Sequence, residues 1–311
     1  MIILKDPIAV SSVMRSDNFG QYSMSERYRE LKQRTGLDFD ATIRLMDFLP
    51  AFLDGERHKE IRRPMARQLA VTKKLQEETA ATQIAFLFEK LFIPPSEIEL
   101  VSQFALPLWR EISASIVNHN RDALDLINEL PWLFVATLSI RERIKINERL
   151  EKFIDDNPMN VDDSLCTIAL RVLGTKPFVG SLVLSLYQII AQNAGKKSSE
   201  IHWPRTFPAS SLTFVDRICK HATQIGNDDF GAGARVRCFT QHETHSSEEN
   251  GALLFGLGVH TCLGKGISEF VWKVLTQHLG QLGSCLVPLD KEMDAYTEPF
   301  LMPRVVRIAV R

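Results

Sequence analysis

The segment Phe255-Gly256-Leu257-Gly258-Val259-His260-Thr261-Cys262-Leu263-Gly264 is the most informative stretch of this 311-residue sequence. A single cysteine lies between spaced glycines, and a helical pattern over residues 265–275 follows it directly. The three glycines tolerate positive φ angles and leave room for a flat ligand to approach the backbone. Cys262 has no neighbouring cysteine with which to pair. The pattern therefore indicates a cysteine that is presented to a ligand.

The position of Cys262 favours a thiolate. It stands just before a predicted helix, where free N–H groups and the helix dipole lower the pKa of a thiol. His260 is suited to hydrogen-bonding a haem propionate, and Phe255 can shield the sulfur from water. A thiolate ligand promotes O–O cleavage on haem, so the loop predicts oxygen or peroxide chemistry. The alternative interpretation is a buried free cysteine beside an ordinary glycine-rich turn.

The spacing F-G-x-G-x-H-x-C-x-G resembles the haem-binding loop of the cytochrome P450 family, and every defined position is filled. The resemblance implies a mainly α-helical fold with a small β part, and haem b as the cofactor. It implies that Cys262 is the axial iron ligand. It also implies that the loop contacts haem through Phe255, Gly258, His260 and Gly264.

Composition limits the other possibilities. With 45% hydrophobic and 24% charged residues, the chain is large enough for one large core or two modest domains. The resemblance implies a single haem-binding domain over residues 1–311. A net charge of −1 gives no reason to expect nucleic acid or an anionic membrane surface as a partner. Five scattered cysteines without CxxC spacing predict neither a disulfide framework nor a zinc site, and they fit a reducing cytoplasm.

The sequence also argues against a leader and a membrane span. The charged pair Lys5-Asp6 comes too early for the apolar part of a secretory signal. The apolar run over residues 178–191 is too short to cross a bilayer and is expected to be a core helix. We therefore expect a cytoplasmic protein without membrane partners.

Hydrophobic periodicity predicts a largely helical chain. Helices are expected over residues 6–15, 25–35, 60–91, 97–118, 121–138, 140–155 and 163–193, with a loop around residues 18–20. A shorter β-like pattern covers residues 208–238, and a final strand covers 304–310. Within the resembled family, the likeness begins near the second helix. The resemblance therefore implies a compressed fold that lacks the N-terminal strands.

Two further segments resemble haem-anchoring elements of the family. Residues 54–63 match its D-x-x-x-H-x-x-x-R-R helix start, in which His58 and Arg62 would bind a propionate from one helix face. Residues 214–217 resemble the strand whose arginine, here Arg217, reaches the other propionate. With His260, four polar groups would hold two carboxylates. The alternatives are a solvated basic helix face and an ordinary surface arginine.

One departure from the family concerns its buried ExxR salt bridge. Arg205 and the proline turn after it match the pattern, but His202 stands where the glutamate is expected, and Glu200 lies two residues earlier. The usual salt bridge is therefore not expected, and Arg205 either pairs differently or is exposed.

The second departure lies on the helix expected to cross the distal side of the haem. Lys176 and Pro177 occupy the places of the acid and the threonine that relay protons in the family. Proline has no hydroxyl and lysine is normally cationic, so neither can serve that relay. The pair is similar to the Arg-Pro pair of fatty-acid peroxygenases, whose arginine binds the substrate carboxylate. The alternative is a solvent-facing lysine beside a proline that only bends the helix.

The resemblance implies oxidation of a small organic substrate, carrying a carboxylate, at an iron–oxo centre. We expect hydrogen peroxide as the oxidant, ahead of dioxygen with a ferredoxin-type electron donor. The alternatives are a redox-neutral rearrangement or dehydration at the haem, and a non-catalytic haem-binding sensor. Loss of the N-terminal sheet would also leave a surface for a homodimer.

Overall fold

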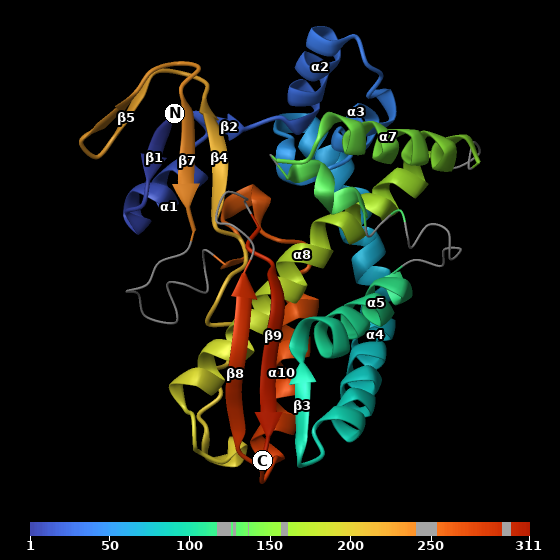
Figure 1. Cartoon of the computed structure of the whole chain (residues 1–311). Helices are drawn as coiled ribbons and strands as arrows, with labels where there is room; N and C mark the ends of the chain where they lie inside the picture. The colour runs from blue at the N-terminus through green and yellow to red at the C-terminus, as the bar shows by residue number, and fades with distance from the viewer. Residues whose placement is uncertain (117–125, 127–128, 136, 157–160, 241–253, 294–299) are drawn as a thin grey trace.

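The computed structural model describes residues 1–116, 126, 129–135, 137–156, 161–240, 254–293 and 300–311 (Figure 1). Helices account for most of this part of the chain. The α-helices are α1 (Pro7–Arg15), α2 (Met24–Thr35), α3 (Asp40–Met46), α4 (Gly55–Leu91), α5 (Leu106–Ile116), α7 (Ile140–Asp155), α8 (Val161–Gln192) and α10 (Lys265–Gln281). The short helices are η1 (Pro50–Phe52), η2 (Leu100–Ala105), η3 (Leu130–Phe134), η5 (Ser198–Glu200) and η6 (Gly258–His260).

The strands form two small sheets and a hairpin. One sheet has the order β1-β7-β4-β2, the second has the order β3-β9-β8, and β5 pairs with β6. The strands are β1 (Ile2–Leu4), β2 (Phe19–Gln21), β3 (Ser96–Glu99), β4 (Phe214–Cys219), β5 (Thr223–Ile225), β6 (Asp228–Phe230), β7 (Arg235–Phe239), β8 (Leu286–Met293) and β9 (Pro303–Val310). In Figure 1 the two sheets lie at different ends of the molecule, and α8 runs between them. The expected mainly helical fold with a small β part is confirmed.

Helix α8 joins the two largest groups of buried side chains. Its first half contributes Ile168, Ala169 and Val172 to a cluster with α3, α4 and α7. Its second half contributes Val179 and Leu182 to a cluster with α5, α10 and sheet β3-β9-β8. Residues Ile168–Gln192 are long and apolar enough to cross a membrane by length and composition alone, yet 67% of the most apolar window is buried. Such burial is what a core helix requires, as expected for residues 178–191.

Local signals in the sequence explain several helix ends. Ser139 accepts from the backbone N–H of Glu142, whose side chain accepts from Ser139 in return, which is a capping box at the start of α7. Helix α2 ends at Gly36, which has a φ of 69° in the left-handed region. These signals account for the agreement between the helices expected over 25–35 and 140–155 and the helices observed.

The helix expected over residues 97–118 is only partly correct. Ser96–Glu99 forms β3 and pairs with β9, and the α-helix begins at Leu106. The carboxylate of Glu99 accepts from the N–H groups of Val101 and Ser102. Glu99 therefore caps the turn that follows it, and the helix does not extend to residue 97. The helix expected over 121–138 lies partly outside the described residues, and its described part contains the 3-10 helix η3.

We expected the fold to lack N-terminal strands. This expectation is corrected, because two short strands lie near the start of the chain. Ile2–Leu4 pairs in parallel with β7, and Phe19–Gln21 pairs antiparallel with β4, in the region expected to be a loop. Three-residue strands show too little alternation to be recognised in a sequence. They form because β4 and β7 offer unpaired edges on which they add.

Gly180 allows α8 to pack closely against residues 211 and 301, and an added methyl group would disrupt this contact. A Cβ there would lie 2.6 Å from Ser211 Cβ and 3.0 Å from the Leu301 carbonyl oxygen. We expect Gly180→Ala to lower the free energy of unfolding by about 1–3 kcal/mol. The matched control is Gly280→Ala on α10, where nothing lies within 4 Å of the added methyl group. It should raise stability by about 0.5–1 kcal/mol, as helix propensity predicts. Urea unfolding of both variants checks this, and equal effects would contradict the packing argument.

Candidate functional site

The cysteine loop is a compact turn that delivers Cys262 to the start of α10. Gly256 and Gly258 have φ angles of 73° and 63°, and a Cβ on Gly256 would lie 3.0 Å from the His260 carbonyl oxygen. The N–H of Cys262 donates to the Phe255 carbonyl at 2.6 Å. Only glycine adopts these positive φ angles without strain. The spacing of the glycines therefore sets where the sulfur lies.

Cys262 has accessible surface, yet its sulfur is surrounded by protein on most sides. Burial raises the pKa of the thiol, and the N–H groups of Gly264 and Lys265 and the charge of Arg62 oppose this only in part. The expectation that the helix start lowers the pKa is therefore corrected. Those N–H groups do point at the sulfur, but desolvation outweighs them. This thiol is protonated at neutral pH unless a cation binds the sulfur.

Helix α4 brings His58 and Arg62 to the cysteine loop, on one helix face as expected. The Arg62 guanidinium donates to the Thr261 carbonyl, next to Cys262. The ring centres of His58 and His260 are 4.3 Å apart. Segments that are about 200 residues apart in sequence therefore meet here. The solvated-face alternative is wrong for His58, which is buried.

Two imidazole nitrogens in this group are buried without a hydrogen-bond partner in the described structure, namely His58 Nε2 and His260 Nδ1. Burying such atoms without a partner is costly, so native proteins rarely do so. A carboxylate at the edge of this ring pair would supply acceptors for N–H groups at these two nitrogens, and Arg62 would add a positive charge. The residues present therefore fit a flat, carboxylate-bearing cofactor whose cation binds Cys262.

Burial lowers the pKa of His58 to about 4, and the nearby charges of His260 and Arg62 act in the same direction. His58 is therefore neutral at pH 7 in this environment. A carboxylate beside the ring would favour the charged form and oppose this shift.

Arg217 extends the same cluster from strand β4. It is 5% exposed, so the surface-arginine alternative is wrong. Its Nη1 donates to Gln21 Oε1 at 2.6 Å and to the Asp216 carbonyl at 3.2 Å. Burial lowers the pKa of the guanidinium, and the negative charge of Asp54 opposes that effect. Arg217 thus lies near Asp54, which in turn contacts His260 at 3.5 Å.

Lys176 and Pro177 lie inside α8, in a different group of contacts. Lys176 is only 9% exposed, and its ammonium lies 4.7 Å from the centre of the Trp132 ring in η3. The solvent-facing alternative for this lysine is therefore wrong. The Ser211 hydroxyl donates to the Pro177 carbonyl at 3.1 Å. The sequence favours a core position for Trp132, and this interpretation is wrong, because the residue is 46% exposed.

The ExxR salt bridge is absent at Arg205 in the described structure, as expected from the missing glutamate. Arg205 is exposed, and Glu200 ends the short helix η5, where its carboxylate accepts from the N–H of Lys197 at 3.4 Å. No ion pair joins Arg205 to a carboxylate in the part of the chain that the structure describes. The carbonyl of Pro204 instead accepts from the buried Trp272 indole at 2.8 Å, which ties this turn to α10.

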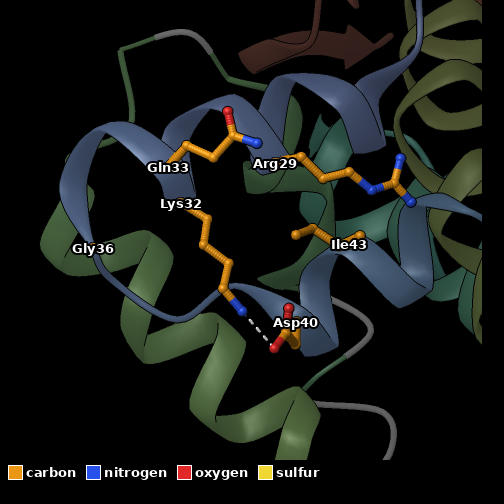
Figure 2. A pocket seen from close by; sticks show the side chains of 6 residues that line it. All are labelled: Arg29, Lys32, Gln33, Gly36, Asp40 and Ile43. Carbon is orange, nitrogen blue, oxygen red and sulfur yellow. Dashed lines mark hydrogen bonds and ion pairs between the residues drawn. The ribbon is translucent and has the colours of Figure 1, made fainter.

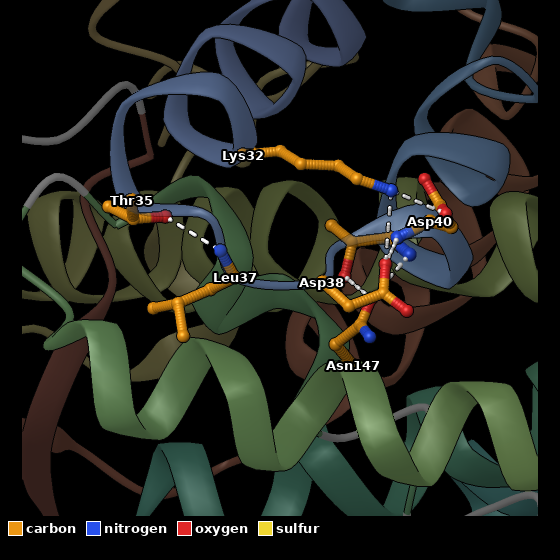
Figure 3. Close-up of polar contacts among 7 residues, drawn as sticks. Lys32, Thr35, Leu37, Asp38, Asp40 and Asn147 are labelled. Carbon is orange, nitrogen blue, oxygen red and sulfur yellow. Dashed lines mark hydrogen bonds and ion pairs between the residues drawn. The ribbon is translucent and has the colours of Figure 1, made fainter.

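A separate surface hollow of about 460 Å³ lies between α2 and α3 and includes Arg29, Lys32 and Asp40 (Figure 2). Its cations are already paired, since Lys32 Nζ lies 2.5 Å from Asp40 and 3.4 Å from Asp38 (Figure 3). The same region is fixed to α7 through the Asn147 side chain, which accepts two hydrogen bonds from Thr42. These ion pairs and hydrogen bonds stabilise the junction between α2 and α3, and the hollow is not the candidate site.

No family model matches the sequence, and no curated protein matches it significantly. Solved structures do match the fold over almost its whole length. P450 RauA, complexed with a biosynthetic intermediate of aurachin RE, is 15% identical, with 99% of this chain and 90% of RauA covered at a TM-score of 0.72. CYP109B1 from Bacillus subtilis is 15% identical, with 99% and 92% covered at 0.72. P450BioI, in complex with an acyl carrier protein ligated to hexadec-9Z-enoic acid, is 13% identical, with 99% and 92% covered at 0.71. The chain has the cytochrome P450 fold.

The low pKa of His58 predicts a specific pH dependence of stability. Its folded-state pKa is about 4 and its unfolded value is 6.5, so between these values the unfolded chain binds a proton that the folded chain does not. The cofactor-free protein should therefore lose up to about 3 kcal/mol of unfolding free energy as pH falls from 6.5 through 4. His58→Gln should lack this contribution. Urea unfolding of both proteins at pH 7 and pH 4.5 measures it, and parallel pH profiles would contradict it.

Proposed function

We propose that this protein binds haem b, with Cys262 as the axial ligand, in one domain over residues 1–311. The observation that carries the proposal is the pair of unpartnered buried nitrogens of His58 and His260, close to the cysteine. These atoms, with Arg62 and Arg217, supply donors for two propionates. The match to solved P450 structures supports the same assignment.

Each residue of the loop has a distinct task in this proposal. Gly258 keeps the backbone close to the haem plane, since it has no side chain and a positive φ. Gly264 and Lys265 direct N–H groups at the sulfur and hold its negative charge. Phe255 belongs partly to the apolar core and lies beside Cys262 through the backbone hydrogen bond. It would keep water from the sulfur.

We propose that the protein is an oxidoreductase that inserts oxygen into a small organic substrate. Bound haem with a thiolate ligand supplies the oxidising chemistry. The chain itself binds and orients the substrate, and α8 is the element with suitable groups. The neighbour P450BioI was solved with a fatty acid held on a carrier protein, and CYP109E1 from Bacillus megaterium with testosterone. These neighbours support a small, largely apolar substrate. We propose that it acts in the cytoplasm.

The Lys176-Pro177 pair supports a substrate with a carboxylate. Lys176 is buried, and a charge pair is stronger where water is excluded. The aromatic ring of Trp132 lies over the ammonium and limits its positions. Pro177 offers neither a hydroxyl nor an N–H, so α8 has no proton donor at that position. A substrate carboxylate held by Lys176 would take over the acid–base role.

That arrangement favours hydrogen peroxide as the oxidant, because a carboxylate can accept a proton from peroxide and return it. Dioxygen with an electron donor remains the competing route, and it would require a proton relay from elsewhere in the chain. A reaction with peroxide alone therefore distinguishes the two. Product only in the presence of NAD(P)H and ferredoxin would refute the peroxide route.

The first test of this proposal is the identity of the axial ligand. Cys262→Ser should remove the thiolate signature from the spectrum of the reduced, carbon-monoxide-bound protein. Cys285→Ser is the matched control, since that cysteine lies beyond the C-terminal end of α10, in a β-bridge with Lys197, and its replacement should leave the spectrum unchanged. An unaltered spectrum in Cys262→Ser would show that another residue is the ligand.

The second test concerns Lys176. Lys176→Ala should reduce peroxide-driven oxidation of a long-chain fatty acid about 10- to 100-fold, as expected for loss of a charged hydrogen bond of about 1.5–3 kcal/mol. The methyl ester of the same acid should be a poor substrate for both proteins. Lys176→Arg retains the charge and should keep part of the activity. Equal turnover of the acid by the wild type and Lys176→Ala would refute the carboxylate role.

A further inference from the structure

Asp54 occupies the position where an aspartate ordinarily caps a helix. It directly precedes α4 and has the extended backbone, with φ −125° and ψ 170°, of an N-cap residue. Its side chain nevertheless makes no hydrogen bond to the helix. Other contacts therefore hold this carboxylate away from the usual capping position.

Those contacts come from three segments that are distant in sequence. Asp54 Oδ2 accepts from the N–H of Gln21 in β2 at 2.6 Å. The same oxygen lies 3.9 Å from Lys220 Nζ, just after β4. Asp54 Oδ1 lies 3.5 Å from His260 Nε2 in the cysteine loop. Burial alone would raise the pKa of Asp54, but these donors outweigh it and lower the pKa, so the group is ionised at neutral pH.

Gly20 lies directly against the Asp54 carboxylate. A Cβ on Gly20 would lie 2.6 Å from Asp54 Oδ2 and 2.6 Å from Lys220 Cε. The missing side chain at position 20 therefore allows the carboxylate to reach the backbone of β2. This close approach is a local reason for glycine in a strand, where it otherwise weakens pairing.

We infer that Asp54 is a positioning residue that fastens the cysteine loop, through His260, to strands β2 and β4. Because Asp54 holds His260 at Nε2, the other ring nitrogen, Nδ1, is the one left without a partner beside His58. With Nε2–H directed at Asp54, His260 donates from Nδ1 to a propionate only as the imidazolium, and the Asp54 carboxylate supplies the counter-charge for that form. In this inference Asp54 acts on the cofactor only through His260. This inference rests on the proposed haem site.

The inference is tested with Asp54→Ala, Asp54→Asn and a control at another helix start. The control is Asp6→Ala, because Asp6 does cap its helix by accepting from the N–H of Ala9 at 2.8 Å. The first measurement is transfer of haem from the loaded protein to excess apomyoglobin. We expect haem loss to be about 10- to 100-fold faster in Asp54→Ala, as for other residues that orient a ligand. Asp54→Asn retains an acceptor for Gln21 and should be intermediate, whereas Asp6→Ala should match the wild type.

The second measurement separates this inference from the haem proposal. Hydrogen exchange of the haem-free protein should be faster in residues 255–264 of Asp54→Ala than in the same residues of Asp6→Ala. If the wild type fails to bind haem, the proposed function fails, and exchange alone decides whether Asp54 fastens the loop. If the wild type binds haem, and Asp54→Ala and Asp54→Asn both retain it as the wild type does, the inference is overturned. Asp54→Asn with native melting and faster haem loss supports it even where Asp54→Ala does not fold.

Discussion

Burial of one helix in two cores is the constraint on which the rest of this fold depends. Helix α8 is about 48 Å long at 1.5 Å per residue, and each half belongs to a different apolar cluster. The first half holds α3, α4 and α7, and the second holds α5, α10 and one sheet. Helix α4 also enters both clusters, with Met65 in the first and Ile84 in the second. Its N-terminal part brings His58 and Arg62 to the loop that presents Cys262.

Electrostatics in the site follow from this burial. Desolvation raises the pKa of Cys262, and it lowers the pKa values of His58, Arg62 and Arg217. In each case burial disfavours the charged form, and a counter-charge would restore it. A metal cation at the sulfur and carboxylates at the basic groups would supply those counter-charges together. Ligand binding at such a site is coupled to release of the thiol proton.

The sequence predicted that the cysteine loop and the start of α4 lie together, and the structure agrees, whereas their role in haem binding stays a prediction. It predicted the small strands poorly. The loop before α10 could be interpreted because glycines and a cysteine at fixed spacing have few alternative uses. The meeting of His58 with His260 was expected from the resemblance, whereas their distance and unpartnered nitrogens depend on packing over the whole chain. Asp54 and Lys220 received no role because an aspartate before a helix normally predicts a cap. Three-residue strands such as β1 and β2 form only through neighbours contributed by distant segments.

The arrangement of the sheet β3-β9-β8 has a consequence for the order of folding. Strand β9 is central in that sheet, and its Val306 N–H donates to Glu99 across 207 residues of chain. Pairings of such long range carry a large loop-closure cost and form late, after local helices have assembled. Strand β3 therefore keeps an open edge until β9 arrives. Residues 96–99 therefore lack their strand partner until residues 303–310 have been synthesised, and during that time the charges of Glu97 and Glu99 oppose pairing of this edge with another chain.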